Sequence, residues 1–268
     1  MPENTRSTGV RSRLEVRDLE VVLGHGMKAT RVLHGVSFEI SVGTTVGLVG
    51  ESGSGKSTIA KTIVGIHQPS AGTTLFDGVD IGHTRGRERA KLRRRIQMIP
   101  QDPYSSLDPR RTIGQTLAEA LDPKNVSVRA NRARIVELLE LVALDASAMG
   151  RYPGEFSGGQ RQRIAIARAL AVEPDLIIAD EITSALDLST QAEILELFER
   201  LRNELRLTVL FVSHNLAVVR QVSDEVIVLL HGDIVETGNA DQVLREPQEL
   251  YTLKLVASVP GSAGFNHD

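Results

Sequence analysis

The start of the chain carries short runs of apolar residues separated by glycine-containing turns. Leu14 to Leu23 and Gly35 to Ile40 partly alternate apolar with polar positions, as strands with one buried face do. Gly24 and Gly26 lie between the two runs, so the pattern predicts an antiparallel pair of strands. Val46 to Val49 is apolar throughout and predicts a compact buried strand.

Helical spacing of apolar residues replaces this pattern further along the chain. Lys56 to Ile66 has that spacing directly after a glycine-rich segment, Arg129 to Leu144 is strongly amphipathic, and Gln160 to Leu170 keeps its apolar residues at helical intervals. Because the stretch from Asp102 to Leu170 has this character throughout, we expect a helical insertion there. The same spacing predicts a helix over Gln191 to Leu205.

Strand-like runs return in the second half of the chain. Leu176 to Ala179, Thr208 to Val212 and Val226 to Leu230 are short and apolar, and a predicted helix separates the first two. Strands that alternate with helices predict a parallel α/β sheet covered on both faces. Ile234 to Glu236 follows the third run across a tight turn, which indicates an appended hairpin. A further strand is expected near Gly72 to Asp77.

Composition narrows the classes of protein and of site. The 268 residues are 41% hydrophobic, enough for a sizeable core, and a formal net charge of −3 gives no global basic field for nucleic acid. The absence of cysteine excludes disulfides, thiolate metal sites and iron–sulfur clusters. No apolar run approaches the ~18 residues of a membrane span, and Met1 to Arg13 lacks the apolar segment of a signal peptide. The basic run Arg85 to Arg95 is most simply a solvated helix face.

The glycine-rich segment Gly50 to Ser57 satisfies the phosphate-loop pattern G-x-x-x-x-G-K-[ST] between a predicted strand and a predicted helix. Glycines let successive backbone N–H groups surround phosphate oxygens, and the following helix adds its positive end. Lys56 is expected to reach the β- and γ-phosphates, and Ser57 to bind Mg²⁺. A glycine-rich loop with a chance lysine is the weaker alternative. The expected nucleotide contacts are Gly50, Ser52, Gly53, Ser54, Gly55, Lys56, Ser57 and Thr58.

Two acids end the apolar run that begins at Leu176. Functional groups in open α/β sheets gather at the carboxyl ends of strands, so Asp180 is placed to hold Mg²⁺ through water. Glu181 is placed to orient a water aimed at the γ-phosphate or to accept its proton. Two acids at a strand end are by themselves only a weak indication of a nucleotide site. The indication becomes stronger because the same chain also contains the phosphate loop.

A second glycine-rich motif, Phe156-Ser157-Gly158-Gly159-Gln160, stands 23 residues before Asp180, counted from Ser157. With Arg161, Gln162 and Arg163 after it, this motif resembles the LSGGQ signature of the ABC ATPase superfamily. The resemblance implies a second phosphate-binding helix start, offered to a nucleotide held by another subunit. By this resemblance, the residues expected to contact that nucleotide are Ser157, Gly158, Gly159 and Gln160.

Further elements of that superfamily follow in the same order along the chain. Gln101 matches the Q-loop glutamine, Ser184 to Asp187 the D-loop, and His214 the histidine after a strand. The resemblance implies that Gln101 contacts Mg²⁺ and water, that His214 contacts the γ-phosphate and attacking water, and that Asp187 lies near the seam between two subunits. It implies a P-loop NTPase (RecA-like) α/β core with an antiparallel β subdomain and an inserted helical subdomain.

Two positions depart from the superfamily pattern. Ile182 stands where proline usually follows the catalytic acid, which removes a fixed φ from the turn leading to Asp187. Relatives usually stack adenine on an aromatic near Leu23, where this chain has none. Leu23 can offer apolar contact, and His25 a weaker stack.

Two segments point to one branch of the superfamily. Arg94 to Pro109 resembles the ATP-binding subunits of oligopeptide, dipeptide and nickel importers, with Pro100 in place of the usual phenylalanine. Glu246 to Thr252 is similar to the closing element PxHPYTxxLLxxxP, although Glu249 and Leu250 replace its histidine and second proline. The resemblance implies an ATP-binding and ATP-hydrolysing subunit that powers an importer of oligopeptides or dipeptides, with ATP and Mg²⁺ as its cofactors.

The branch also implies the assembly around the chain. We expect a second ATP-binding subunit, identical or related, two transmembrane permease subunits, and an indirect extracytoplasmic solute-binding protein, at the cytoplasmic face of the membrane. The alternative is a soluble ABC ATPase of a nucleic-acid or enzyme assembly, favoured only by the basic run; no nucleic acid is expected. The expected organisation is a flexible start over 1–13, one ATPase domain over 14–260 with the insertion over about 102–170, and a flexible tail over 261–268.

Overall fold

The computed structural model describes residues 11–24 and 26–258. Its first layer is an antiparallel sheet in the strand order β2-β1-β4-β5. The expected pair is confirmed as β1 and β2, although β1 starts two residues before the predicted Leu14. The four strands are β1 (Ser12–Leu23), β2 (Thr30–Ser41), β4 (Ala71–Phe76) and β5 (Val79–Asp80), with a short 3-10 turn η1 (Gly26–Lys28) between the first two.

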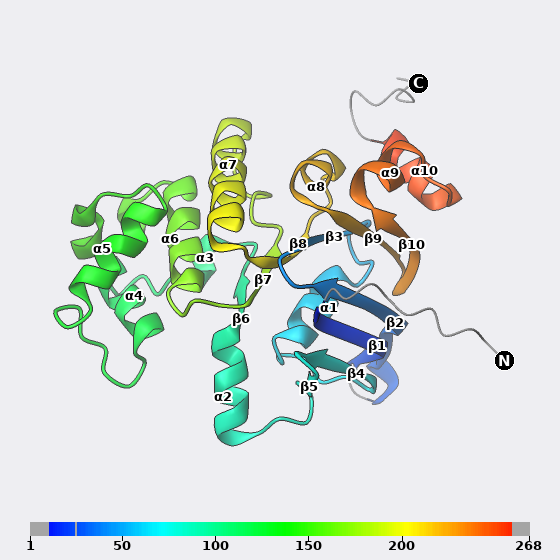
Figure 1. Cartoon of the computed structure of the whole chain (residues 1–268), viewed down its shortest axis with the longest axis horizontal. Coiled ribbons are helices and arrows are strands. Elements are labelled where there is room, and N and C mark those ends of the chain that lie inside the picture. The colour runs from blue at the N-terminus through cyan, green and yellow to red at the C-terminus, as the bar shows by residue number, and fades with distance from the viewer. Residues whose placement is uncertain (1–10, 25, 259–268) are drawn as a thin grey trace.

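The second layer is a six-stranded sheet in the order β10-β9-β3-β8-β7-β6. The strands from β9 to β6 are parallel, and β10 is the antiparallel partner of β9, so the predicted hairpin is confirmed. Figure 1 shows this sheet at the centre, with the blue antiparallel sheet beside it. Its strands are β3 (Thr45–Val49), β6 (Ile96–Ile99), β7 (Leu176–Asp180), β8 (Thr208–Val212), β9 (Glu225–Leu230) and β10 (Asp233–Asn239).

The chain between β6 and β7, which are neighbours in the sheet, forms a lobe of helices. It forms the green left side of Figure 1, away from the antiparallel sheet. Its members are α3 (Pro103–Ser106), α4 (Ile113–Leu121), α5 (Arg132–Leu141), α6 (Gly158–Leu170) and the 3-10 turns η2 (Ala146–Gly150) and η3 (Pro153–Glu155).

The remaining helices connect or follow the strands of the central sheet. The first of them ends three residues before the predicted Ile66, after which the chain turns at Gly65, with φ of 74°. They are α1 (Lys56–Ile63), α2 (Gly86–Arg95), α7 (Leu188–Leu205), α8 (Leu216–Val222), α9 (Ala240–Arg245) and α10 (Leu250–Ala257). In the described part of the chain, no helix has the length and apolar character that crossing a membrane demands.

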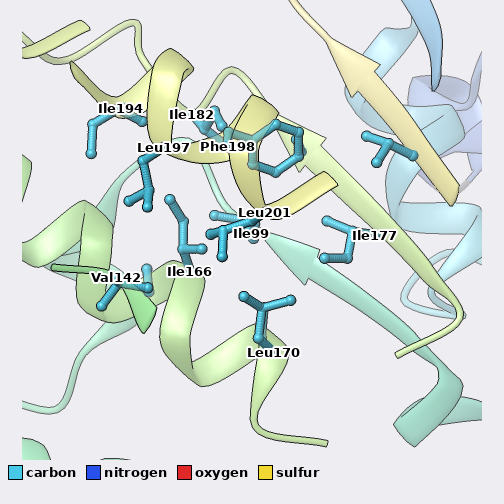
Figure 2. Packing of buried hydrophobic residues seen from close by; sticks show 14 of the residues in the cluster. Ile99, Val142, Ile166, Leu170, Ile177, Ile182, Ile194, Leu197, Phe198 and Leu201 are labelled. Carbon is cyan, nitrogen blue, oxygen red and sulfur yellow. The ribbon is translucent and has the colours of Figure 1, made fainter. Parts of the chain in front are cut away.

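Two apolar clusters lie on opposite faces of the central sheet, which is why its strands are apolar throughout. In β7, Ile177 and Ala179 belong to the cluster shared with the helical lobe and α7, whereas Leu176 and Ile178 belong to the cluster shared with α1 and the antiparallel sheet. Figure 2 shows the first cluster between α6, α7 and the strands. The α/β class, with both faces of the sheet covered, is therefore confirmed.

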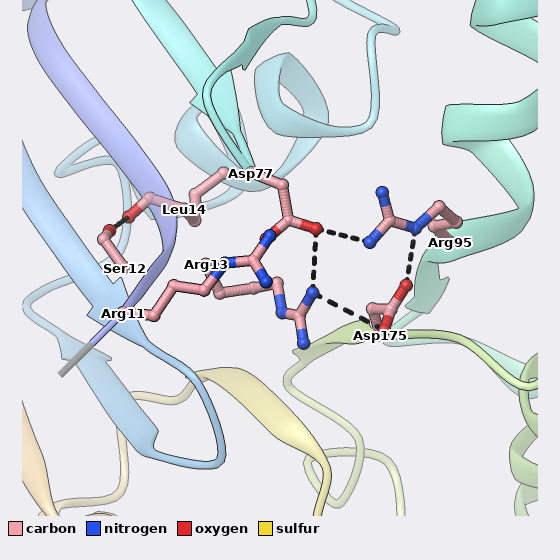
Figure 3. A network of polar contacts seen from close by, with 7 residues as sticks. All are labelled: Arg11, Ser12, Arg13, Leu14, Asp77, Arg95 and Asp175. Carbon is pink, nitrogen blue, oxygen red and sulfur yellow. Dashed lines mark hydrogen bonds and ion pairs between the residues drawn. The ribbon is translucent and has the colours of Figure 1, made fainter.

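A polar network ties the antiparallel sheet to the central one (Figure 3). Asp77 accepts hydrogen bonds from Arg95 and, at 2.8 Å, from Arg13. Arg95 also donates to Asp175, just before β7, at 2.6 Å. Burial alone would raise the pKa of the Asp77 carboxyl, but the hydrogen bonds and charges of Arg95 and Arg13 outweigh it and hold that pKa below its usual value. The last arginine of the basic run is therefore structural.

Candidate functional site

The phosphate loop leaves the carboxyl end of β3 and leads into α1. Gly50 has φ of 148°, and a Cβ there would lie 2.1 Å from the carbonyl oxygen of Leu229. Gly55, which precedes α1, has φ of 111°. Glycine is required at both positions because a side chain would clash or strain the backbone. The loop therefore lies tight against β9.

Lys56 lies under this loop with 5% of its surface exposed. Its Nζ donates to the carbonyl oxygens of Gly50 and Glu51, each at 2.8 Å. Burial lowers the pKa of the ammonium, although the nearby charges of Glu181 and Asp180 counteract that shift. An ammonium has three N–H donors, so one remains for a ligand in the pocket.

Ser57 and Asp180 meet below the loop. The Ser57 Oγ donates to Asp180 Oδ1 at 3.4 Å, and Asp180 is buried at the end of β7. Burial raises the pKa of the Asp180 carboxyl, and the charge of Glu181 adds to that shift. A hydroxyl and a carboxylate are the oxygen ligands that Mg²⁺ prefers, and a cation here would offset the cost of burying the carboxylate. The donor set therefore fits the expected metal.

Glu181 stands next to this pair and is held from two sides. Gln101 Nε2 donates to Glu181 Oε2 at 3.0 Å, and His214 Nδ1 lies 3.3 Å from Glu181 Oε1. Gln101 also lies 3.3 Å from the Ser184 hydroxyl, which the sequence analysis had not assigned to the site. Glu181 has φ of 48°, a strained conformation that turns the chain sharply after β7. The structure thus brings together all three residues expected to handle the attacking water.

An open pocket of about 330 Å³ lies between the loop and two of these residues, Gln101 and Glu181, whereas His214 does not line it. Val32 of β2 supplies its apolar wall, and Leu23, the expected adenine contact, does not line it. Leu23 instead pairs with Thr30 and packs partly buried on the antiparallel sheet's cluster. His25, the other candidate, falls outside the described residues. The pocket is lined by Val32, Ser52, Gly53, Gly55, Lys56, Ser57, Thr58, Gln101 and Glu181.

The second glycine-rich motif forms the start of α6 and does not line this pocket. Ser157 caps the helix by accepting from the Gln160 N–H at 3.3 Å, while the Gln160 side chain accepts from the Ser157 N–H at 3.1 Å. Gly158 is half-buried beside Leu186, but Gly159 is buried. A Cβ on Gly159 would lie 2.3 Å from Thr190 Cγ2, so this glycine is also required for packing.

Asp187 caps the start of α7 beside that motif. It accepts from the Thr190 N–H at 3.0 Å and from the Ser189 hydroxyl at 2.7 Å. These hydrogen bonds, the one from Ser189 foremost, lower the pKa of the Asp187 carboxyl. Ile182, in the turn that leads to Asp187, is buried in the cluster shared with the helical lobe (Figure 2), so its side chain packs within the core. Like Ser157, Asp187 lies outside the pocket.

Tyr251 of α10 is a contact of the loop that no local pattern had indicated. Its hydroxyl accepts from the Glu51 N–H at 3.1 Å. The sequence indicated this region only through the resemblance of Glu246 to Thr252 to the element PxHPYTxxLLxxxP.

Comparison with known proteins identifies the family. The ABC transporter family model matches residues 33–184. A putative peptide import ATP-binding protein of Brucella ovis is 48% identical over 231 residues, covering 86% of this chain and 73% of that protein. The oligopeptide transport ATP-binding protein OppF of Lactococcus lactis is 46% identical over 227 residues, covering 84% of this chain and 71% of its own length.

Solved structures agree with this result. The cbiO1 protein of Clostridium perfringens, part of the ABC transporter complex cbiONQ, superposes with a TM-score of 0.77 at 29% identity, covering 88% of this chain and 92% of its own. A dimeric ATP-binding cassette in a post-hydrolysis state, bound to ADP and Pi, superposes with a TM-score of 0.76 at 31% identity. The match covers 85% of this chain and 98% of the cassette. This chain, with its phosphate loop and signature helix in place, therefore belongs to the ABC transporter family.

Proposed function

We propose that the chain is the ATP-hydrolysing motor of a peptide importer, docked at the cytoplasmic face of the membrane on two permease subunits. The proposal of ATP hydrolysis rests on the placement of Glu181, which lies between Gln101 and His214 at the pocket that contains Lys56. The names of the Brucella ovis and Lactococcus lactis relatives, both peptide-import or peptide-transport ATP-binding proteins, support the cargo.

The pocket suggests a division of roles among its residues. Backbone N–H groups of Gly53 to Thr58 bind the phosphates, and Lys56 neutralises the β- and γ-phosphates. Ser57 and Asp180, with Gln101, would hold Mg²⁺, which offsets the charge of the phosphates.

Three groups then govern the attacking water. Glu181 accepts its proton or orients it. The imidazole of His214 and the amide of Gln101 hold the Glu181 carboxylate in place.

We also propose that each site is completed by a second ATP-binding subunit. Ser157 and the start of α6 lie outside the pocket of their own chain, although the positive end of a helix suits a phosphate. A head-to-tail pair of subunits would place the α6 start of each against the nucleotide of the other. Asp187, exposed next to this helix start, would then lie at the seam.

The alternative of a nucleic-acid assembly finds no support in the basic helix α2. Arg95 is engaged with Asp77 and Asp175, Arg94 donates to the carbonyl oxygen of Leu121 at 3.3 Å, and Arg89 donates to that of Gly65 at 3.0 Å. The carboxylates therefore compensate the charge of Arg95, whereas Arg89 and Arg94 keep their charge but are tied to carbonyl oxygens of the chain, which agrees with a structural role for this helix.

Peptide uptake tests the proposed function directly. In cells that lack this gene, wild-type chain should restore uptake of labelled di- and oligopeptides, and Glu181→Gln should not. The purified variant should turn over ATP about 10²–10³-fold more slowly while still binding it, because it loses the group that handles the water. Glu196→Gln, on an exposed position of α7, is the control. Normal uptake in cells carrying Glu181→Gln would refute the motor role.

A further inference from the structure

The peptide group between Gly50 and Glu51 is held at both of its ends. Its carbonyl oxygen, on Gly50, accepts from Lys56 Nζ at 2.8 Å. Its N–H, on Glu51, donates to the hydroxyl of Tyr251 at 3.1 Å. Glycine at position 50 offers no Cβ to restrain rotation of this peptide, so the two hydrogen bonds contribute to fixing its direction.

Tyr251 is itself held firmly in place. Glu236 of β10 accepts from the backbone N–H groups of Gln248, at 2.9 Å, and Glu249, at 3.2 Å, which anchors the start of α10. The apolar part of Tyr251 packs, with Leu255, against the large apolar cluster on the lobe side of the sheet. The tyrosine ring therefore presents its hydroxyl to the loop from a fixed position.

We propose that Tyr251 is a positioning residue for Lys56. By accepting from the Glu51 N–H, it keeps the Gly50 carbonyl turned toward the lysine, and that carbonyl aims the ammonium at the pocket. The closing segment of the chain thus acts on the phosphate loop through one peptide group. This inference rests on the proposed role of Lys56 in binding phosphate.

Tyr251→Phe removes the acceptor and keeps the packing of the ring. We expect about 5-fold weaker ATP binding, which corresponds to about 1 kcal/mol, because the Gly50 carbonyl no longer holds the lysine in its aimed position. The unfolding midpoint of the nucleotide-free protein should fall only slightly, because the exposed Glu51 N–H can donate to water instead. Because Lys56 contacts the phosphates before and during hydrolysis, KM should rise more than kcat falls. The control is Tyr152→Phe, which removes a hydroxyl from an exposed ring on the helical lobe.

A double-mutant cycle separates action through Lys56 from a merely structural contact. In a Lys56→Ala background, titrated to saturation, Tyr251→Phe should change the ATP dissociation constant less than 2-fold. An equal loss in both backgrounds, or wild-type binding by Tyr251→Phe alone, would overturn the proposal while leaving the role of Lys56 intact. Unchanged ATP binding by Lys56→Ala would overturn both.

Discussion

Two buried carboxylates in this chain illustrate opposite electrostatic situations. Asp77 lies among arginines that favour its ionised form, whereas Asp180 lies under the phosphate loop beside a second acid and has a raised pKa. Folding therefore favours ionisation at Asp77 and opposes it at Asp180. The first carboxylate stabilises the protein at neutral pH. Asp180 lowers the stability of the protein at neutral pH, and its function lies in the site.

Substituting these carboxylates by the isosteric amide should therefore shift stability in opposite directions. At pH 7 without nucleotide, Asp77→Asn should destabilise by about 2 kcal/mol, because Arg13 and Arg95 then keep only Asp175 as a shared acidic partner. Asp180→Asn should stabilise by about 1 kcal/mol while abolishing activity. Urea denaturation of the three proteins measures both shifts.

The pH dependence of these shifts provides the check. The stabilisation from Asp77 is present above its unfolded pKa and lost as pH falls through its lower folded pKa. The cost of Asp180 develops as pH rises from its unfolded pKa through its higher folded pKa, so Asp180→Asn should lose its advantage near about pH 4. A gain from Asp180→Asn that persists undiminished in acid would show that burial of charge is not the cause.

Motifs with a fixed local geometry could be identified from the sequence, and contacts made at a distance could not. The phosphate loop, Glu181 and His214 were predicted because each follows a recognisable strand. Val32 and Tyr251 were not, because they reach the loop from β2 and from the far end of the chain. Leu23 was expected from its position along the chain; it pairs with Thr30 and is not among the residues that line the pocket.

At the scale of elements, the start of α6 packs directly on the start of α7. Gly159 meets Thr190 there, and Thr190 donates to Asp187 through both its N–H and its hydroxyl. The signature glycine therefore has a packing role in addition to any contact with phosphate.

Gly159→Ala should show this packing role. In an open helix the change would stabilise by about 0.5–1 kcal/mol, but the clash with Thr190 should turn it into a loss of about 1–3 kcal/mol. Adding Thr190→Ser removes the methyl group and keeps the hydroxyl, so the double variant should recover the lost stability. Gly158→Ala, whose Cβ would meet only Leu186 Cδ2 at 3.2 Å, is the matched control. A thermal midpoint of Gly159→Ala at or above the wild-type value would contradict the prediction.

The elements that the sequence left unassigned are short. β6 spans four residues between a charged helix and Pro100, too few for its period to be read. The helices α8 and α9, of seven and six residues, also fall below the length at which helical spacing is distinctive. Long periodic segments such as α7 were placed correctly, although α7 starts three residues before the predicted Gln191.

For the whole molecule, the position of the α6 start outside the pocket is the observation behind the proposed composite sites. In the proposed pair, the α6 start of one subunit completes the site of the other. A bulky cationic side chain at position 157 should therefore leave ATP binding by its own chain nearly unchanged. It should abolish turnover in the partner's site. ATP, which brings the γ-phosphate, should promote pairing of subunits, and ADP alone should not.

Ser157→Arg tests this when it is combined with its natural partner subunit. Dimerisation with ATP or ADP can be followed by size-exclusion chromatography, and turnover at each site by pairing with a hydrolysis-deficient copy. Ser147→Arg, exposed elsewhere on the helical lobe, is the control. Full turnover at both sites with Ser157→Arg would exclude composite sites.

The strand order of the central sheet also determines when the phosphate loop can acquire its shape during synthesis. β3, which carries the loop, pairs only with β8 and β9, and these strands end at Val212 and Leu230. The antiparallel sheet, by contrast, is complete once Asp80 has left the ribosome. We therefore expect the loop of a nascent chain to gain both of its supporting strands only once residue 230 has emerged, and nucleotide binding to begin only after that point.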